Sequence, residues 1–460
     1  MSRILLAGDR SSSGKTSIVA GLLSALKKRG LCVQPFKVAM DYIDPSYHTL
    51  ITDRWCRNLD GYLMPERTIL EVFDRASRGA DLSVIEGVRG LYEGYDGDLG
   101  STAQIAKLLK TPVLFVVDAR SITRSAAALV KGYADFDPQV NIKGVILNKV
   151  GSQRHADKAK KEIEQYTGIE VVGVIPRDDS MQLSMRHLGL VPVQEGRSRH
   201  EGFTERLDRV RALVEEGLSI DRILDLAREA EPLPAPKADL YLQNDLGRGL
   251  KVGVALDEAF NFYYRDNLEL MELSGAQVTP FSPVNDRRLP EVDGVYIGGG
   301  YPELYSRELS ANSGMIDSLI RAKERGLPIY AECGGLMYAS QEIDWEGRYA
   351  MAGLIPGKVR KGKVRVVSYV RGALTRDCLL GPQGSEIMGH EFHHSELVLD
   401  DDVDYAIKLE RGKGIQGGLD GLIHGSVVAS YCHVHSASFR GFPSNFLKAC
   451  YRAKEENHGH

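Results

Sequence analysis

Short apolar runs alternate with longer stretches of helical spacing along the first half of the chain. The apolar runs lie at residues 4–7, 32–38, 82–85, 113–117, 145–147 and 171–175. Between them, as at 17–26, 102–109 and 124–132, apolar residues recur every three or four positions, which predicts helices. Strands that alternate with helices form mostly parallel sheets covered on both faces. The first half is therefore predicted to be an α/β domain.

The same alternation resumes in the second half, with apolar runs at residues 251–255, 295–297 and 327–331. Between the halves, charges are dense and helical in spacing from 197 to about 230, and a proline-rich stretch then follows at 231–236. Proline at this density favours an extended linker. We therefore expect two α/β domains, joined by a helical segment and linker and followed by a C-terminal tail. The predicted bounds are 1–196, 197–248, 249–446 and 447–460.

Composition narrows the class of protein. The 460 residues are 43% apolar and 26% charged, with a net charge of −4, so no overall field attracts nucleic acid or a membrane surface. No apolar run has the length of a membrane span, and no secretory signal pattern opens the chain. The six cysteines are scattered without metal-type pairs, which is typical of a reducing compartment. We expect a cytoplasmic protein that binds neither nucleic acid nor membranes.

A turn rich in glycine and serine joins the first predicted strand to the first predicted helix. It reads Gly8-Asp9-Arg10-Ser11-Ser12-Ser13-Gly14-Lys15-Thr16. Such a turn points backbone N–H groups and the helix dipole at a phosphate. Lys15 offers a positive charge to the β and γ oxygens of a nucleotide, and Thr16 offers a hydroxyl to Mg²⁺. The strict motif has glycine at position 9, whereas here the glycine comes one residue earlier. The turn still predicts a nucleotide site.

Polar residues follow several other strands of the first half. Asp41 and Asp44 come after the second strand, Glu86 follows the third, and Asn148 follows a later one, where it could face the adenine. Ligands of open parallel sheets bind at the carboxyl ends of the strands, and carboxylates there can hold Mg²⁺. Any one of these acids could be a solvated loop residue. Three such features at successive strand ends favour a single site.

The second half contains a cysteine in a strand-to-helix turn, Glu332-Cys333-Gly334-Gly335. Exposure near a helix N-terminus favours the thiolate, and small neighbours permit the sharp turn of a nucleophile. A cysteine nucleophile needs a base, for which His433 is the best candidate. His390, His393 and His394 are the other candidates. A flexible turn at 298–303 could present backbone N–H groups to an oxyanion.

Together these motifs resemble those of the cobyrinate a,c-diamide synthase family over essentially the whole chain. The first half is similar to the P-loop fold of dethiobiotin synthetase, and the second to a class I glutamine amidotransferase domain. The motifs that carry the resemblance are those at residues 8–16, 41–45, 86–88, 298–303, 332–337, 389–393 and 431–433.

The resemblance implies that Cys333, activated by His433, releases ammonia from glutamine. In the other domain, ATP and Mg²⁺ would convert a substrate carboxylate into an acyl phosphate, from which ammonia displaces phosphate. The substrate would be a tetrapyrrole whose a and c acetate side chains become amides. The implied contacts are Gly8, Ser11, Gly14, Lys15, Thr16, Ser17, Lys37 and Asn148 for ATP; Thr16, Asp41 and Glu86 for Mg²⁺; Asp41, Tyr42, Asp44, Arg89 and Tyr92 for the tetrapyrrole; and Gly299, Gly300 and Gly334 for glutamine and its oxyanion.

The chain departs from the family pattern at several positions. Many members carry Gly-Pro where this chain has Ala39-Met40. The corrin-type members usually have methionine at the position of Arg89 and aspartate at that of Glu93, so the loop resembles the methanogen branch, which includes Ni-sirohydrochlorin a,c-diamide synthase of coenzyme F430 synthesis. Added arginine suits a polyanionic substrate. His435 replaces the glutamate that commonly follows the catalytic histidine, so we expect a Cys–His dyad.

Three functional hypotheses follow. The first is a,c-diamidation of Ni-sirohydrochlorin, and the second is the same reaction on cobyrinate. The third is a regulatory P-loop ATPase of the MinD type with a binding module, although a binding module needs no activated thiol. Arg10 stands where the signature lysine of MinD-type ATPases would be, so the loop alone does not exclude this third hypothesis. A homodimer is compatible with each hypothesis.

Overall fold

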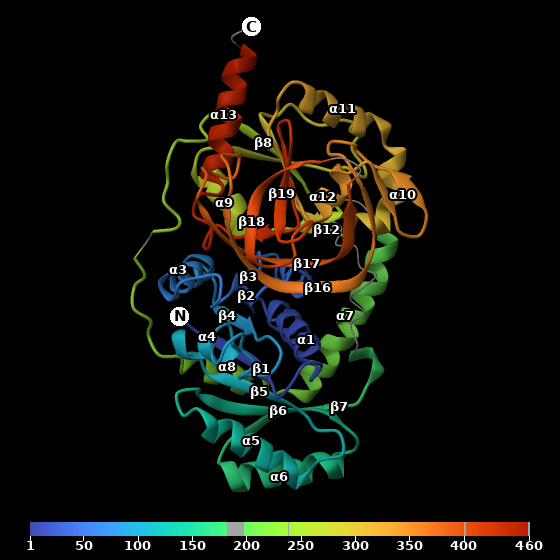
Figure 1. Ribbon diagram of the computed structural model, residues 1–460. Coiled ribbons are helices and arrows are strands. Elements are labelled where there is room, and N and C mark those ends of the chain that lie inside the picture. Colours follow the sequence, from blue (N-terminus) through green and yellow to red (C-terminus); the bar gives the residue numbers. More distant parts are fainter. Residues whose placement is uncertain (182–196, 238, 400–401, 459–460) are drawn as a thin grey trace. The chain divides into compact units, whose positions relative to one another are not determined.

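The computed structural model describes residues 1–181, 197–237, 239–399 and 402–458. Figure 1 shows the chain coloured from its N-terminus to its C-terminus. The described residues form two compact units, one made of residues 1–181 with 197–237 and the other of residues 239–458. Within the described ranges, no helix is both long and apolar enough to cross a membrane.

The first unit is built on a seven-stranded sheet in which all neighbouring strands are parallel. The strand order is β3-β2-β4-β1-β5-β6-β7. The strands are β1 (Arg3–Gly8), β2 (Val33–Val38), β3 (Arg57–Leu59), β4 (Leu82–Glu86), β5 (Val113–Asp118), β6 (Ile142–Val150) and β7 (Glu170–Pro176). Each apolar run predicted for this half is a strand, and only the short β3 was not predicted. The parallel α/β fold is confirmed.

Eight α-helices of the first unit are described. They are α1 (Lys15–Lys28), α2 (Ile43–Thr52), α3 (Glu66–Ser77), α4 (Thr102–Leu108), α5 (Arg124–Phe136), α6 (Gln153–Thr167), α7 (Arg197–Gly217) and α8 (Ile220–Arg228). Val210 and Val214 of α7 are buried in the same core as α1, where a Cβ on Gly21 would come 2.5 Å from Val214 Cγ2. The helices after residue 197 therefore belong to the first unit, whereas the sequence suggested a separate segment.

The second unit contains a mixed sheet with the strand order β10-β8-β11-β13-β20-β19-β18-β16-β14-β15. Its parallel part is β8 (Lys251–Ala255), β10 (Gln277–Phe281), β11 (Gly294–Ile297), β13 (Ile329–Glu332) and β20 (Val427–Ser430). The rest is β14 (Glu342–Asp344), β15 (Arg348–Ala350), β16 (Lys358–Leu374), β17 (Glu386–Val398), β18 (Asp404–Arg411), β19 (Leu419–His424) and β21 (His433–Val434). The long antiparallel pair of β16 and β17 was not predicted.

Shorter elements complete the second unit. They are β9 (Phe260–Phe262), α9 (Arg265–Leu273), β12 (Gly299–Gly300), α10 (Ser306–Ala311), α11 (Ser313–Glu324), α12 (Gly334–Ala339) and α13 (Ser444–His458). Residues 447–458 of the predicted C-terminal tail belong to α13, and Leu447 and Cys450 on this helix are buried in the core.

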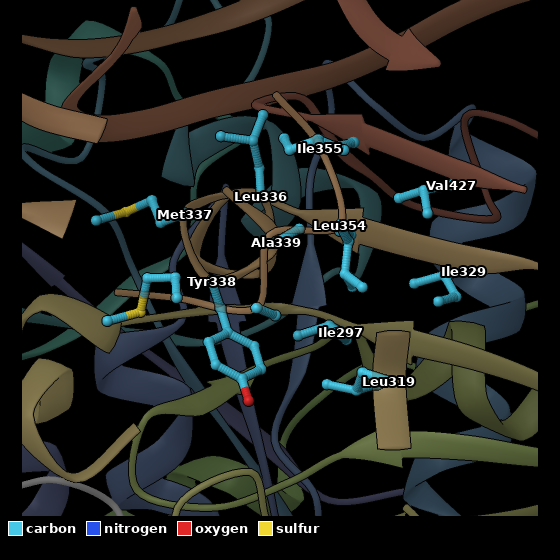
Figure 2. Close-up of a cluster of buried hydrophobic side chains, with 14 of the residues drawn as sticks. Ile297, Leu319, Ile329, Leu336, Met337, Tyr338, Ala339, Leu354, Ile355 and Val427 are labelled. Atoms are coloured by element: carbon cyan, nitrogen blue, oxygen red, sulfur yellow. The ribbon is translucent and has the colours of Figure 1, made fainter. Parts of the chain in front are cut away.

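The short helix α12 lies inside the core of the second unit. All six of its residues are buried. Figure 2 shows Leu336 and Tyr338 of this helix among Ile297, Ile329 and Val427, which come from β11, β13 and β20. Because apolar side chains surround α12, its first turn is held firmly at the carboxyl end of β13.

Candidate active site

The predicted phosphate loop lies between β1 and α1. Gly14 precedes the first residue of α1 with φ 97°, and Ser12 has φ 63°. The Asn148 amide donates a hydrogen bond to the Ser13 carbonyl over 2.8 Å, and a Cβ on Gly14 would come 2.1 Å from Asn148 Nδ2. Glycine at position 14 is required by both the left-handed backbone and this close approach. Asn148, expected near the adenine, braces the loop.

Lys15 crosses from the loop to the segment that follows β4. Its Nζ donates to the Arg89 carbonyl over 2.5 Å and to the Arg10 carbonyl over 3.3 Å. Burial lowers the pKa of Lys15 to about 8, although Glu86 acts in the opposite direction. A phosphate bound at the loop would favour the charged form of this lysine.

The acids predicted at the strand ends meet beside Thr16. The Thr16 hydroxyl donates to Glu86 Oε1 over 2.6 Å and lies 3.2 Å from Asp44 Oδ2. Lys37 Nζ lies 2.6 Å from Asp44, 2.9 Å from Glu86 and 3.7 Å from Asp41. The parallel register explains the cluster, because Leu6 of β1 and Lys37 of β2 are both paired with Glu86 of β4.

Charges inside this cluster offset the cost of burial. Burial opposes the charge on Lys37, but the three carboxylates around it raise its pKa. Burial also opposes the Glu86 charge, but Lys37 and His48 hold the pKa of Glu86 well below its usual range. Burial and the neighbouring Asp44 raise the pKa of Asp41 to about 8. His48 Nε2 lies 2.5 Å from Glu86 Oε2. This contact was not predicted from the sequence, because the two residues are 38 positions apart in the chain.

The Thr16 cluster supplies donors of the kind that Mg²⁺ prefers, a hydroxyl and carboxylate oxygens. Asp44, rather than the predicted Asp41, lies within hydrogen-bond distance of Thr16. Asp41 instead accepts backbone N–H bonds from Ile43 and Asp44 at the start of α2. Among the described residues, no three His, Cys, Asp or Glu side chains form a metal cage. The Thr16 hydroxyl with the Glu86 and Asp44 carboxylates suits an ion that takes few protein ligands and completes its shell with phosphate and water.

Two residues predicted to bind ATP flank the loop differently. Ser11 is exposed on the turn, whereas the Ser17 hydroxyl donates to the Met181 carbonyl within the protein. Ser17 therefore has a structural partner, and Ser11 remains available to a ligand.

The residues predicted to contact the tetrapyrrole differ in how exposed their side chains are. Tyr42 is buried at the N-terminus of α2. Arg89 is exposed and has φ 50°, a strained backbone conformation for a residue with a side chain. Tyr92 donates its hydroxyl to the Tyr133 carbonyl over 2.7 Å, and burial raises the pKa of Tyr92 to about 12. Arg89 is therefore better placed to meet a ligand than Tyr92.

Cys333 stands at the junction of β13 and α12 with φ 52° and ψ −99°. This strained conformation is of the kind found at functional turns, and it is held by a 2.7 Å bond from the Cys333 N–H to the Ser430 carbonyl. The Cys333 Sγ lies 3.6 Å from the Phe392 carbonyl oxygen. The residue was expected to be exposed, but it is only 4% exposed because α12 is enclosed by the core.

His433 joins Cys333 to a carboxylate. Its Nδ1 lies 2.8 Å from Glu332 Oε1, and both side chains are buried. Burial opposes the imidazolium, but the charges of the Cys333 sulfur and of Glu332 raise the pKa of His433 to about 10. The expectation of a dyad is therefore wrong, since Glu332 occupies the place of the third member. His435, at the position of the usual glutamate, instead lies 3.4 Å from Asp266.

The predicted oxyanion glycines surround this pair. A Cβ on Gly299 would come 2.6 Å from His433 Cε1, and a Cβ on Gly334 would come 2.8 Å from the Gly300 nitrogen. Glycine is needed at these points because any side chain would collide with the site.

Among the other candidate bases, His390 is buried with its Nε2 3.1 Å from the Tyr264 hydroxyl. Burial lowers the pKa of His390 well below the ordinary value, and its ring meets that of His433 edge to face. His390 therefore packs against the His433 ring as a neutral imidazole. Glu332 could have been found from the sequence, because it directly precedes the nucleophile at the end of a strand.

The two units thus define a class: a nucleotide-binding unit and a cysteine-dependent amidotransferase unit in one chain. Residues 4–191 match the model for the CobQ/CobB/MinD/ParA nucleotide binding domain, and residues 251–441 match that for the CobB/CobQ-like glutamine amidotransferase domain. The third hypothesis, an ATPase with a binding module, is excluded by the second match.

Curated relatives cover nearly the whole chain. The chain is 54% identical to cobyrinate a,c-diamide synthase of Methanosarcina acetivorans, with 97% of this chain and 95% of that protein covered. It is 44% identical to the protein of that name from Methanobrevibacter smithii (96% and 98% covered) and 42% identical to the one from Listeria innocua (95% and 96% covered). The chain belongs to the cobyrinate a,c-diamide synthase family, whose members are ATP-dependent ligases with glutamine as the nitrogen donor.

Proposed function

We propose that this protein uses ATP and glutamine to convert the a and c acetate side chains of a tetrapyrrole, cobyrinate among them, into amides. The observation that carries the proposal is that each unit gathers side chains suited to one half of this reaction. In the second unit, His433 Nδ1 lies 2.8 Å from Glu332 Oε1, and the sulfur of Cys333, the residue after Glu332, helps to raise the pKa of His433. The first unit holds a phosphate loop beside buried carboxylates and Lys37. The curated relatives bear the name of this reaction on cobyrinate.

Ammonia release follows from the cysteine site. The Cys333 thiolate attacks the carboxamide carbon of glutamine, and backbone N–H groups of the glycine turn stabilise the oxyanion. The His433 imidazolium gives its proton to the departing nitrogen, so that ammonia leaves and a glutamyl thioester remains. His433 then removes a proton from water, which hydrolyses the thioester to glutamate and restores the thiolate. Glu332 holds the imidazole by its Nδ1–H throughout.

Amide formation requires that a carboxylate be activated, because its oxygen is a poor leaving group. A substrate carboxylate oxygen attacks the γ-phosphorus of ATP, ADP departs, and an acyl phosphate forms. Ammonia then adds to the acyl carbon, phosphate leaves, and a proton is lost to give the amide. Lys15 offsets the charge on the transferred phosphoryl group. Thr16, Glu86 and Asp44 would hold Mg²⁺, which neutralises phosphate charge when bound.

The test is product analysis with two nitrogen donors. With cobyrinate, ATP and glutamine, mass spectrometry should show two successive replacements of a carboxyl by an amide. Cys333→Ala should abolish synthesis from glutamine but retain synthesis from ammonium chloride at raised pH. If Cys333→Ala lost both activities while remaining folded, the assignment of two separate sites would be wrong.

A second substrate, Ni-sirohydrochlorin, is favoured by Arg89, whose side chain is exposed and whose own backbone carbonyl accepts a hydrogen bond from Lys15. No ion pair between Arg89 and Glu93 is found among the described residues, so the guanidinium has no carboxylate partner there. A carboxylate of the substrate would provide one. Arg89→Met should raise the KM for Ni-sirohydrochlorin about tenfold, since a charge-assisted bond contributes roughly 1.5–3 kcal/mol. Equal changes with cobyrinate would remove Arg89 as the basis for this preference.

A further inference from the structure

His393 is a buried histidine of β17 that the reaction described above does not use. Its side chain is 5% exposed, and its ring lies flat on the Tyr431 ring, with the centroids 3.9 Å apart and the planes at 8°. His393 Nδ1 lies 2.9 Å from the Ser395 carbonyl oxygen. Within the described part of the chain, no group forms a hydrogen bond with its Nε2. One ring nitrogen is therefore satisfied and the other is available.

The satisfied nitrogen determines the chemistry of the available one. A carbonyl oxygen only accepts hydrogen bonds, so His393 Nδ1 carries the proton and Nε2 of the neutral ring is an acceptor. Burial lowers the pKa of His393 to about 4. The hydrogen bond to Ser395 raises this pKa, whereas the positive charges of Lys413 and His433 lower it further. The ring is thus neutral near pH 7. A buried acceptor that lacks a donor costs free energy, which an N–H group from a ligand would recover.

The position of His393 connects it to the cysteine site. The preceding residue, Phe392, provides the carbonyl oxygen that lies 3.6 Å from Cys333 Sγ. Side chains alternate between the two faces of a strand. The Phe392 ring lies under the Arg365 guanidinium, 4.7 Å from its centroid, so the His393 ring lies on the other face with Tyr431. Tyr431 in turn lies two residues before His433.

We propose that His393 Nε2 accepts a hydrogen bond from an N–H group of glutamine while the carboxamide carbon of glutamine lies at Cys333. The inference rests on the proposed roles of Cys333 and His433. Glutamine has two such groups, the side-chain carboxamide nitrogen and the α-ammonium. A neutral imidazole acceptor suits either group, because it neither repels a positive charge nor presents a proton of its own.

The test uses three variants of the full chain. His393→Phe keeps a flat ring on Tyr431 but removes the acceptor, and should raise the KM for glutamine about tenfold, a change typical for a lost buried hydrogen bond. His393→Gln keeps an acceptor and should change the KM by less than about threefold on the same reasoning. His394→Phe is the matched control, since His394 is the exposed neighbour in the same strand, and should leave the KM unchanged.

Two further measurements separate the outcomes. Ammonia-dependent synthesis should be unchanged in His393→Phe, which shows that the protein is folded and that only glutamine use is impaired. The same KM comparison is made with a glutamine analogue that lacks the α-amino group. If His393→Phe no longer raises the KM for this analogue, the α-ammonium is the donor to His393 Nε2; if it still raises the KM, the carboxamide nitrogen is the donor. An unchanged KM in His393→Phe, or an equal rise in His394→Phe, would overturn the inference. A wild-type protein that releases no glutamate would instead contradict the proposed function itself.

Discussion

The bond between Glu332 and His433 provides the sharpest prediction. Glu332→Gln keeps the size of the side chain and its contacts with the Tyr296 and Tyr330 hydroxyls, but removes the negative charge 2.8 Å from His433 Nδ1. Hydrogen bonds to charged groups contribute roughly 1.5–3 kcal/mol. At about 1.36 kcal/mol for each factor of ten in rate, glutaminase kcat should fall roughly 10- to 200-fold.

The pH profile gives a second, independent result. The imidazolium form of His433 is lost as the pH rises through its pKa, which the Cys333 sulfur and Glu332 raise to about 10 in opposition to burial. Without the Glu332 charge this pKa is lower, so the alkaline limb of glutaminase activity should move to lower pH. A merely structural role for Glu332 would reduce activity without moving that limb.

Glutamate release by the full chain is the assay, with ammonia-dependent synthesis as a measure of folding. Tyr330→Phe is the matched control, because it removes a hydroxyl that contacts Glu332 Oε2 and leaves the carboxylate in place. It should keep most of the activity and the wild-type pH profile. If Glu332→Gln retained full kcat and an unchanged alkaline limb, the assignment of Glu332 as the third member of the catalytic group would be refuted.

Three other predictions concern the first unit. Lys15→Ala should abolish synthesis with either nitrogen donor, and normal ammonia-dependent synthesis in this variant would contradict the role of Lys15 at the phosphate. In the wild-type protein, the KM for ATP should rise as the pH passes about 8, because Lys15 then loses its charge. Glu86→Gln should shift the Mg²⁺ concentration needed for half-maximal synthesis upward by about tenfold, and an unchanged Mg²⁺ titration would rule out the ligand role. Ala39→Gly should raise the unfolding temperature by about 2–4 °C in calorimetry, because Ala39 has φ 66° and relief of that strain contributes about 1 kcal/mol. Gly30→Ala should lower the unfolding temperature, because Gly30 has φ 82° and a Cβ there would meet no neighbouring atom, so that only backbone strain is added. Shifts of the same sign in Ala39→Gly and Gly30→Ala would argue against backbone strain as the cause.

The structure also explains one departure from the family pattern. Ala39 stands where many members have glycine, and its backbone is in the left-handed region that glycine adopts without strain. The loop after β2 therefore keeps the glycine conformation even though the residue differs. Asn58 secures it with bonds from its amide to the Ala39 and Asp41 carbonyls over 2.9 and 2.8 Å.

Much of the molecule follows from local pattern. The apolar runs identified the strands of the first unit, and the strand-loop-helix order around Lys15 identified the phosphate site. Cys333 was identified in the same way, because a strand followed by small residues and a helix leaves few conformations for the turn. These features depend on neighbours in the chain, and local periodicity and backbone sterics are visible in sequence.

Other features depended on the strand order and register, which bring distant residues together. Lys37 and His48 surround Glu86 only because β2 lies beside β4, and Asp44 rather than Asp41 reaches Thr16 because Asp41 is used to begin α2. Likewise Glu332 reaches His433, 101 residues away, because β13 pairs with β20 just before the chain turns into β21. Local pattern specifies which elements form and which residues lie at their ends. The packing of many elements decides which of those ends lie together. The reason is that the fold must pair its buried charges and bury its apolar faces at the same time.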